Sequence, residues 1–308
     1  MSPEPVAART PHHGESTERM LRRLELTVRR RLDGLLHGSY QGLIPGQGTE
    51  AGESREYAPG DDVRRMDWPV TARTTVPHVR QTVADRELET WVVFDASASL
   101  DFGTARAEKR DVALAGVAAL VILAVGGGNR IGALVAGAPT LLRLPARSGM
   151  PAARSLLRRV ADLQPAAAGR EKTELGDALE TLRRLPRRRG LVVVVSDFLG
   201  DPTWPDPLRS LGALEEVLCL EIVDPRDLDL PDVGLLELVD PESGERLEVQ
   251  SGQRHVREAY ATAAREQRAE IARCIRRAQA GHIQLRTDRD WVLEIVRYVA
   301  EQRRRRLR

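Results

Sequence analysis

The stretch that decides the fold of this chain reads Trp91-Val92-Val93-Phe94-Asp95-Ala96-Ser97-Ala98-Ser99. Its four consecutive apolar residues end on a carboxylate, and two hydroxyl side chains follow at alternate positions. A short apolar run with polar boundaries is typical of a strand buried on both faces, as in a parallel sheet. Ligands of open parallel sheets bind beyond the carboxyl ends of the strands. We therefore expect Asp95, Ser97 and Ser99 at that edge of a sheet.

These three residues allow two interpretations. Asp95, Ser97 and Ser99 place hard oxygen donors on one turn, which suits a divalent cation such as Mg²⁺. Alternatively, Ser97 or Ser99 caps the following helix, and Asp95 hydrogen-bonds the turn. The stretch by itself leaves both interpretations open.

The composition of the 308 residues is that of an ordinary folded protein, with 42% hydrophobic and 30% charged residues. Nucleic-acid binding is not expected, because the formal charge is only +2 and no aromatic residues interleave with the arginine clusters at 29–31, 187–189 and 303–306. Cys219 and Cys274 have no metal-ligand spacing, which favours free thiols in a reducing compartment.

Membrane insertion and export are not expected either. The first 18 residues are polar and contain no apolar signal core. The longest apolar run, 112–125, is shorter than the ~20 residues that a membrane span needs. A transmembrane segment is therefore not expected, and the default location is cytoplasmic.

Strands and helices alternate along most of the chain. Apolar runs at 191–195 and 216–223 predict further buried strands, and the apolar segment 104–125 predicts a helix packed against a sheet. Alternation of this kind implies right-handed crossovers. The predicted fold is a doubly wound α/β domain, whose mainly parallel sheet is flanked by helices.

The predicted domain organisation has four parts. Residues 1–16 form a disordered N-terminus, and residues 17–88 form an N-terminal helix and a β extension, in which 76–83 is an edge strand leading into the core. Residues 89–303 form the α/β domain, with a β-hairpin insertion near 235–250. Residues 304–308 form a basic tail.

Two further residues join the opening stretch at the same edge of the predicted sheet. Asp197 follows the apolar run 191–195, and Thr173 lies on a loop that opens onto the same edge. Parallel strands bring the two aspartates to one rim. Two carboxylates with neutral hydroxyls balance a divalent cation and leave an open position, which an acidic side chain of a partner could fill.

The order Asp-x-Ser-x-Ser, then Thr, then Asp resembles the metal-ion-dependent adhesion site of von Willebrand factor type A domains. Within that superfamily, the chain resembles the bacterial family called Domain of Unknown Function 58, through Tyr57-x-Pro59-Gly60-Asp61-Asp62-x-Arg64-x-x-Asp67-Trp68 and the later Ala72-Arg73. Asp197 is followed by Phe198 rather than by the Gly common in type A domains.

The resemblance implies a fold of the von Willebrand factor type A kind and a site for Mg²⁺, or for Mn²⁺ or Ca²⁺. Its ligands would be Asp95, Ser97, Ser99, Thr173 and Asp197. It also implies a partnership with a MoxR-type AAA+ ATPase that assists the assembly or activation of other proteins.

The family motif itself has a structural interpretation. We interpret the motif residues as parts of a tight turn and a capped helical turn. They are Pro59, Gly60, Asp61, Asp62, Arg64, Asp67, Trp68 and Arg73. A second acidic metal cluster of Asp61, Asp62 and Asp67 is the alternative.

The leading functional interpretation is a non-enzymatic, metal-dependent protein-interaction module. The six histidines, at 12, 13, 37, 78, 255 and 282, all lie away from the motifs of the predicted rim, so no acid–base partner for a nucleophile is evident. One alternative is a Mg²⁺-dependent phosphatase or nuclease that uses Asp95 and Asp197 as ligands. Another is a scaffold with a vestigial metal site.

Overall fold

A six-stranded sheet forms the centre of the computed structural model. The structure describes residues 17–28, 30, 54–58, 63, 66–80, 88–105, 107–126, 128–164, 172–188, 190–200 and 202–306. The strand order is β10-β7-β6-β3-β4-β5. The strands are β3 (Glu89–Asp95), β4 (Arg130–Ala136), β5 (Leu142–Arg147), β6 (Gly190–Ser196), β7 (Glu216–Val223) and β10 (Gly281–Arg286). All neighbours are parallel except β5, which pairs antiparallel with β4 at the edge.

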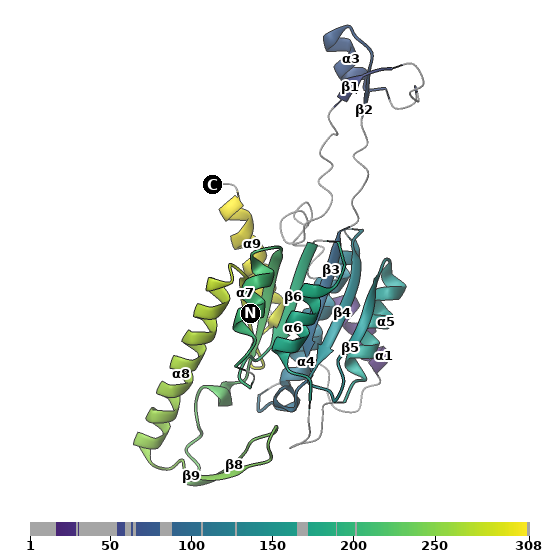
Figure 1. Ribbon diagram of the computed structural model, residues 1–308. Coiled ribbons are helices and arrows are strands. Elements are labelled where there is room, and N and C mark those ends of the chain that lie inside the picture. The colour runs from purple at the N-terminus through teal and green to yellow at the C-terminus, as the bar shows by residue number, and fades with distance from the viewer. Residues whose placement is uncertain are drawn as a thin grey trace, which may run out of the picture.

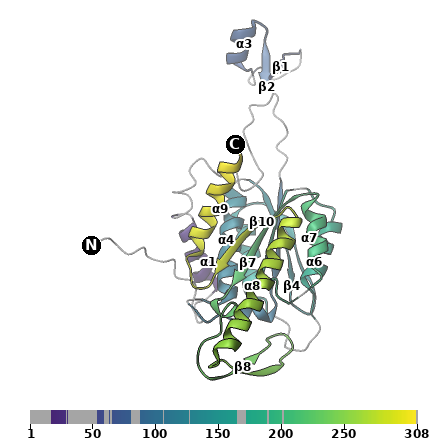
Figure 2. The same ribbon diagram turned by 90° about the vertical axis from the view of Figure 1, so that its left-hand side faces the viewer.

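Helices cover both faces of this sheet, as Figures 1 and 2 show. One face carries α1 (Thr17–Val28), α4 (Lys109–Gly126), α5 (Met150–Ala161) and α9 (Trp291–Arg306). The other carries α6 (Leu175–Arg184), α7 (Pro205–Gly212) and α8 (Arg254–Arg277). The strand β3 divides its side chains between the two cores, because Val92 and Phe94 face α4 while Trp91 and Val93 face α6. The prediction of a doubly wound α/β domain is confirmed.

The central helix α4 is apolar on all sides, as its burial requires. It begins at Lys109, five residues later than the predicted start at Thr104, and a short 3₁₀ turn at Ala98–Asp101 precedes it. Thr104 lies outside the helix because its backbone N–H and its hydroxyl both donate to the Asp224 carboxylate, at 3.0 and 2.6 Å. The predicted helix therefore loses its first residues to a side-chain contact.

A small unit precedes the main sheet. It contains β1 (Ser54–Glu56), α3 (Trp68–Thr74) and β2 (His78–Arg80), and Figure 1 shows it set apart from the six-stranded sheet. The edge strand predicted at 76–83 is confirmed for 78–80, and the structure shows that it pairs antiparallel with β1 in the extension rather than with the six-stranded sheet. Residues 81–83 lie outside the described part of the chain.

The C-terminal part contains the predicted hairpin, formed by β8 (Leu235–Val239) and β9 (Arg246–Gln250). In Figure 1 it lies at the end of the molecule toward which the parallel strands run. The helix α9 continues to Arg306, so most of the expected basic tail lies within it. Among the described residues, no helix combines the length and the apolar character needed to cross a membrane.

Candidate functional site

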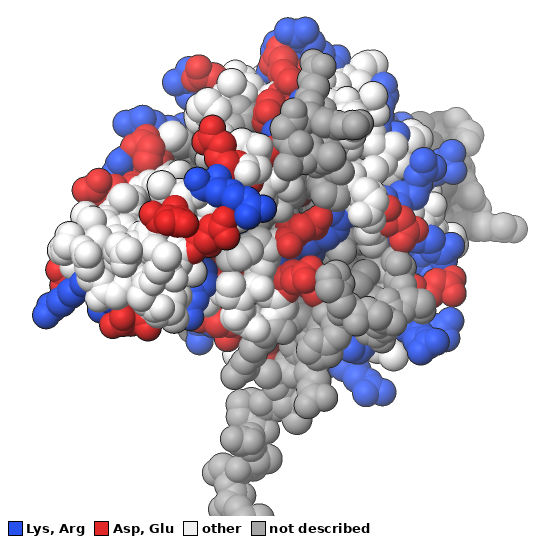
Figure 3. Space-filling view, turned by 90° about the horizontal axis from the view of Figure 1, so that it is seen from below, with Lys and Arg blue, Asp and Glu red and all other residues white. Residues whose placement is uncertain are grey.

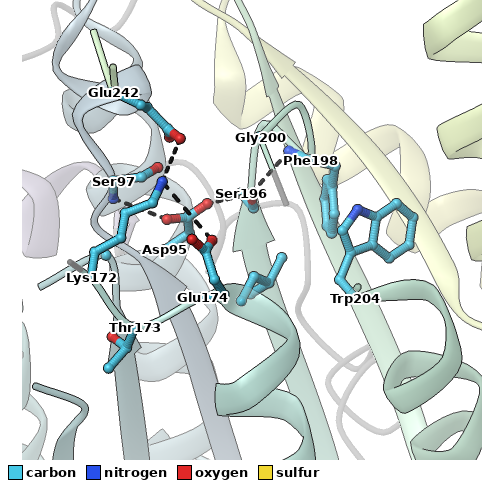
Figure 4. A pocket seen from close by; sticks show the side chains of 12 residues that line it. Asp95, Ser97, Lys172, Thr173, Glu174, Ser196, Phe198, Gly200, Trp204 and Glu242 are labelled. Atoms are coloured by element: carbon cyan, nitrogen blue, oxygen red, sulfur yellow. Dashed lines mark hydrogen bonds and ion pairs between the residues drawn. The ribbon is translucent and has the colours of Figure 1, made fainter. Parts of the chain in front are cut away.

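A polar pocket lies at the carboxyl ends of β3 and β6 (Figure 4). Its polar lining consists of Asp95, Ser97, Lys172, Thr173, Glu174, Ser196 and Glu242, and Phe198 and Trp204 lie on one side of it. The two aromatic rings meet edge to face, with centroids 4.9 Å apart. Three sequence-predicted ligands, Asp95, Ser97 and Thr173, thus line the same pocket.

Asp95, the last residue of β3, is the buried carboxylate of this pocket. Its Oδ1 accepts a hydrogen bond from the Ser97 N–H at 2.9 Å, and its Oδ2 accepts one from the Ser196 hydroxyl at 2.6 Å. Burial raises the pKa of Asp95, and the nearby carboxylate of Asp197 raises it further. A positive charge at this position would relieve both effects.

The two serines of the opening stretch are close together, since the Ser97 and Ser99 hydroxyl oxygens are 3.0 Å apart. Ser97 precedes the 3₁₀ turn, but its side chain makes no capping hydrogen bond. The interpretation of Asp95 as a residue that hydrogen-bonds its own turn is confirmed, whereas capping by Ser97 is not observed.

Thr173 is fixed to the end of β4. Its N–H and its hydroxyl both donate to the carbonyl oxygen of Ala138, at 2.9 and 3.1 Å, and its own carbonyl accepts from the Gly137 N–H at 2.9 Å. Gly137 has a φ of +86°, and a Cβ there would lie 2.2 Å from the Ser97 nitrogen. A glycine at 137 therefore lets the loops of Asp95 and Thr173 approach each other.

Asp197 does not line the pocket. Its Oδ2 accepts from the ammonium of Lys109 at 3.1 Å, and its Oδ1 accepts from the Leu199 N–H at 3.2 Å. Lys109 also pairs with Asp227 at 2.9 Å. Burial opposes the charge of Lys109, but Asp197 and then Asp227 outweigh it and raise the pKa of this lysine above its usual value.

The ion pairs of Lys109 belong to a larger buried network between β6, β7 and α8. Arg268 donates to the Asp197 carbonyl at 2.9 Å and pairs with Glu221 at 2.8 Å and with Asp227 at 3.0 Å. His282 contacts the other oxygen of Glu221 at 2.7 Å. This network draws the Asp197 carboxylate away from the pocket, while the hydroxyl of the preceding residue, Ser196, contacts Asp95.

Sequence reasoning missed Lys172, Glu174 and Glu242. The Lys172 ammonium donates a short hydrogen bond to Glu242 and lies 3.9 Å from Glu174 (Figure 4). Burial opposes the charge of Lys172. The hydrogen bond and negative charge of Glu242, and then the charges of Glu174 and Asp95, outweigh this effect and raise the pKa of Lys172. One signal was present in the sequence: Lys109 and Lys172 are the only two lysines, and each is paired with acidic residues in this region.

The donor set can be compared with the needs of a divalent cation. Asp95, Ser97, Ser99 and Thr173 supply a carboxylate and hydroxyl oxygens, which fit Mg²⁺ if water completes its shell, as Mg²⁺ commonly requires. Asp197 would have to leave Lys109 to join them. Among the described residues, no cluster of three or more His, Cys, Asp or Glu side chains is arranged to hold a metal. None of the described histidines lines the pocket.

Part of the family motif falls outside the described residues, namely Pro59, Gly60, Asp61, Asp62 and Arg64. Asp67 caps α3 by accepting from the Val70 N–H at 3.3 Å. Trp68 is 67% exposed and Arg73 is exposed, so the described structure gives neither a role in a core.

A family model and several relatives match this chain. The family model described as protein of unknown function DUF58 matches residues 53–270. An uncharacterized protein of Mycobacterium tuberculosis is 56% identical over 284 residues, which are 92% of this chain and 89% of the relative. An uncharacterized protein of Mycobacterium avium is 44% identical over 164 residues, 53% of this chain and 96% of the relative.

Two solved structures are also similar to this chain. BatB from Bacteroides thetaiotaomicron shares 12% identity over 70% of this chain and 99% of its own, with a TM-score of 0.44. A von Willebrand factor type A structure from Catenulispora acidiphila shares 11% identity over 74% of this chain and 43% of its own, with a TM-score of 0.38.

Proposed function

This chain belongs to the DUF58 family, and from that premise we propose that it is a non-enzymatic protein-interaction module. Its pocket would bind an acidic side chain of a partner protein with the help of a divalent cation. The observation that carries the proposal is the convergence of Asp95, Ser97 and Thr173 on one pocket at the carboxyl edge of the sheet. A buried carboxylate beside hydroxyl oxygens supports a hard cation there, with Mg²⁺ before Mn²⁺ or Ca²⁺.

The cation would supply an open coordination position for a carboxylate. Asp95, Ser97, Ser99 and Thr173 are the residues that would hold it. Asp95 and Ser97 are set by hydrogen bonds within their own turn, and Thr173 is set by its hydrogen bonds to Ala138. Binding and orientation are the tasks this arrangement supports. A hydrolase would also need an acid–base group beside the cation.

The cation part of the proposal is tested by calorimetric titration of Mg²⁺ and Mn²⁺ into the wild type and into Asp95→Ala. Asp206→Ala is the matched control, because Asp206 is exposed on α7 and pairs there with Arg209. We expect binding to the wild type and the control, and none to Asp95→Ala. Equal heats from all three proteins would remove the cation from the proposal.

A MoxR-type AAA+ ATPase is the proposed partner, which the resemblance to the family supports, and a shared cytoplasmic location is proposed with it. The test is a pull-down of the purified ATPase by the immobilised chain, with and without chelator. We expect the wild-type chain to retain the ATPase, and we expect chelator and the Asp95→Ala substitution each to abolish this retention. Turnover of phosphate esters by the wild type that Asp95→Ala abolishes would favour the hydrolase instead.

A further inference from the structure

The tip of the β8–β9 hairpin reaches the pocket from a part of the chain that contains none of the predicted ligands. Glu242, in the turn between the two strands, points toward Lys172 and hydrogen-bonds its ammonium (Figure 4). Its side chain is 22% exposed and lines the pocket together with Asp95 and Ser97. A carboxylate of the chain itself therefore already lines the pocket to which the proposed function brings the carboxylate of a partner.

The protein backbone makes room for this carboxylate. A Cβ at Gly200, in the loop after β6, would lie 3.0 and 3.2 Å from the two carboxylate oxygens of Glu242. These separations are tighter than ordinary van der Waals contact. The Glu242 carboxylate therefore lies in close contact with Gly200 in the loop that follows β6.

The turn that presents Glu242 is organised by its own residues. Asp240 accepts hydrogen bonds from the Glu242 N–H at 2.9 Å and from the Ser243 hydroxyl at 2.6 Å, and its carbonyl accepts from the Gly244 N–H at 2.8 Å. Gly244 has a φ of +77°, which suits glycine. The hairpin therefore offers the pocket a preorganised carboxylate.

The hairpin strands, by contrast, are largely exposed to solvent. Leu235, Val239 and Leu247 are 58%, 53% and 63% exposed, so burial of these side chains does not hold the hairpin against the domain. In Figure 3, which views this end of the molecule, uncharged side chains gather at the left, the side on which Figure 1 places the hairpin. The Lys172–Glu242 ion pair, whose side chains are 17% and 22% exposed, is a contact that holds the hairpin tip at the pocket.

The base of the hairpin is anchored by hydrogen bonds. Gly234 has a φ of +80°, and the Ser251 hydroxyl and the Gly252 N–H both donate to its carbonyl, at 2.9 and 3.2 Å. Ser251 is buried, and Arg257 donates to its carbonyl at 2.6 Å. The base is thus fixed, while a two-stranded ribbon beyond it has little stability of its own.

We propose that the β8–β9 hairpin is a built-in competitor for the pocket, in which Glu242 occupies the place of a partner's acidic side chain. The inference rests on the proposed function and specifies its ligand class, an acidic residue presented on a turn. It also assigns Lys172 as the group that pairs with the carboxylate in the hairpin-bound state. A partner binds by displacing Glu242, and the hairpin then moves about its base.

The test uses the full chain and a labelled synthetic peptide of residues 235–250 as the probe, with binding followed by fluorescence anisotropy. Glu242→Gln in the chain frees the pocket without changing the size of the side chain. We expect this variant to bind the peptide at least ten-fold tighter than the wild type does. A peptide carrying Glu242→Gln should not bind to either protein. The matched control is Glu237→Gln, which removes an exposed carboxylate from the same hairpin and should bind like the wild type.

Two results would overturn the inference. One is equal peptide affinity for the wild-type and Glu242→Gln chains, and the other is equal affinity of the Glu and Gln peptides for the Glu242→Gln chain. Circular dichroism of each variant checks that the fold is retained. The double variant Lys172→Met, Glu242→Gln should bind the peptide more weakly than Glu242→Gln alone when both are measured in chelator.

The same titrations in Mg²⁺ and in chelator separate this inference from the cation proposal. If Mg²⁺ fails to bind but the Glu242→Gln chain gains peptide affinity in chelator, the hairpin inference stands without the cation. If Mg²⁺ binds but the variant gains no peptide affinity, the hairpin inference fails while the cation proposal stands.

Discussion

The side chain of Lys109 determines where Asp197 points. Lys109 lies in the first turn of α4, is 2% exposed, and pairs with both Asp197 and Asp227. A lysine buried in this way is not evident from a sequence, since lysine is seldom fully buried. The position of Asp95 could be predicted because it depends on its own strand. The orientation of Asp197 could not, because it depends on Lys109, which is 88 positions away in the chain.

Removing the charge of Lys109 leaves the buried Asp197 carboxylate without its cation, while Asp227 keeps its ion pair with Arg268. We expect Lys109→Met to lower the free energy of unfolding by about 3–5 kcal/mol, the usual cost of breaking a buried pair. Urea unfolding followed by circular dichroism measures it. Arg254→Met is the matched control, because the Arg254–Glu258 pair is exposed and should change stability by less than about 0.5 kcal/mol. Similar losses for the two variants would contradict the structural role of Lys109.

Asp224 ties three segments together, since it accepts hydrogen bonds from Thr104, Arg226 and Thr287. Burial opposes its ionisation, but these donors, Thr104 first, outweigh it and hold the pKa of Asp224 below its usual value. A lowered carboxyl pKa stabilises the fold above the unfolded-state pKa of about 4, and this contribution is lost as the pH falls through the lower folded-state value.

The buried hydroxyl of Thr287 donates to Asp224 at 2.7 Å, so Thr287→Val isolates one of these donors. We expect a loss of about 1.5–3 kcal/mol at pH 7, as for other hydrogen bonds to a charged group. The difference in the free energy of unfolding between Thr287→Val and the wild type should narrow as the pH falls below about 4. Urea unfolding at several pH values measures it, with Thr262→Val on the exposed face of α8 as the control. A loss of stability that stays constant with pH would show that the Thr287 hydroxyl does not act through the charge of Asp224.

Among the elements, the strands could be predicted most fully. The bounds of β7, β8 and β9 match their apolar or alternating runs, because side-chain periodicity sets the length of a strand. The reversed direction of β5 follows from the connection after β4, residues 137–141, which is too short for the crossover that a parallel pairing needs. The starts of helices were hard to predict from the sequence, because a distant side-chain contact such as that of Thr104 with Asp224 can keep the first residues out of the helix.

The packing of α7 against the end of α8 depends on a glycine. A Cβ at Gly212 would lie 1.9 Å from the carbonyl oxygen of Ala278, a backbone atom that cannot move aside independently. We expect Gly212→Ala to lower the free energy of unfolding by roughly 1–3 kcal/mol, as overpacking commonly does. Gly126→Ala, at the end of α4, is the control, because nothing lies within 4 Å of its added Cβ. The control should leave stability unchanged or raise it by up to about 1 kcal/mol. Equal effects of the two changes, measured by thermal unfolding, would argue against the close contact.

At the scale of the whole molecule, the pocket is assembled from five separate segments, one of which is the loop of Gly137 after β4. Asp95 and Ser196 come from neighbouring parallel strands, Lys172 precedes α6, and Glu242 comes from the hairpin. The convergence of the strand ends could be predicted from the topology of a parallel sheet. The contribution of the hairpin could not, because 70 residues separate Lys172 from Glu242 and a hairpin pattern does not specify where its tip lies.

The helix α1 extends the fold on the face covered by α4 and α5. Leu21, Leu24 and Val28 are buried in the same core as these two helices. The predicted boundary at residue 89 places α1 with the extension, whereas its buried side chains belong to the core of the main domain. The helix should therefore unfold together with the six-stranded sheet, in one cooperative transition.

This expectation can be tested within α1, because Leu24 is 3% exposed and Leu26, two residues later, is 49% exposed. We expect Leu24→Ala to lower the free energy of unfolding by about 2–5 kcal/mol, the usual cost of truncating a buried leucine. Leu26→Ala should cost far less, since its side chain already contacts water. Urea unfolding measures both, and an unchanged denaturant slope would show that α1 still unfolds with the sheet. If Leu24→Ala costs no more than Leu26→Ala, the helix contributes little to the core. The domain would then begin at β3, and α1 would belong functionally to the N-terminal extension.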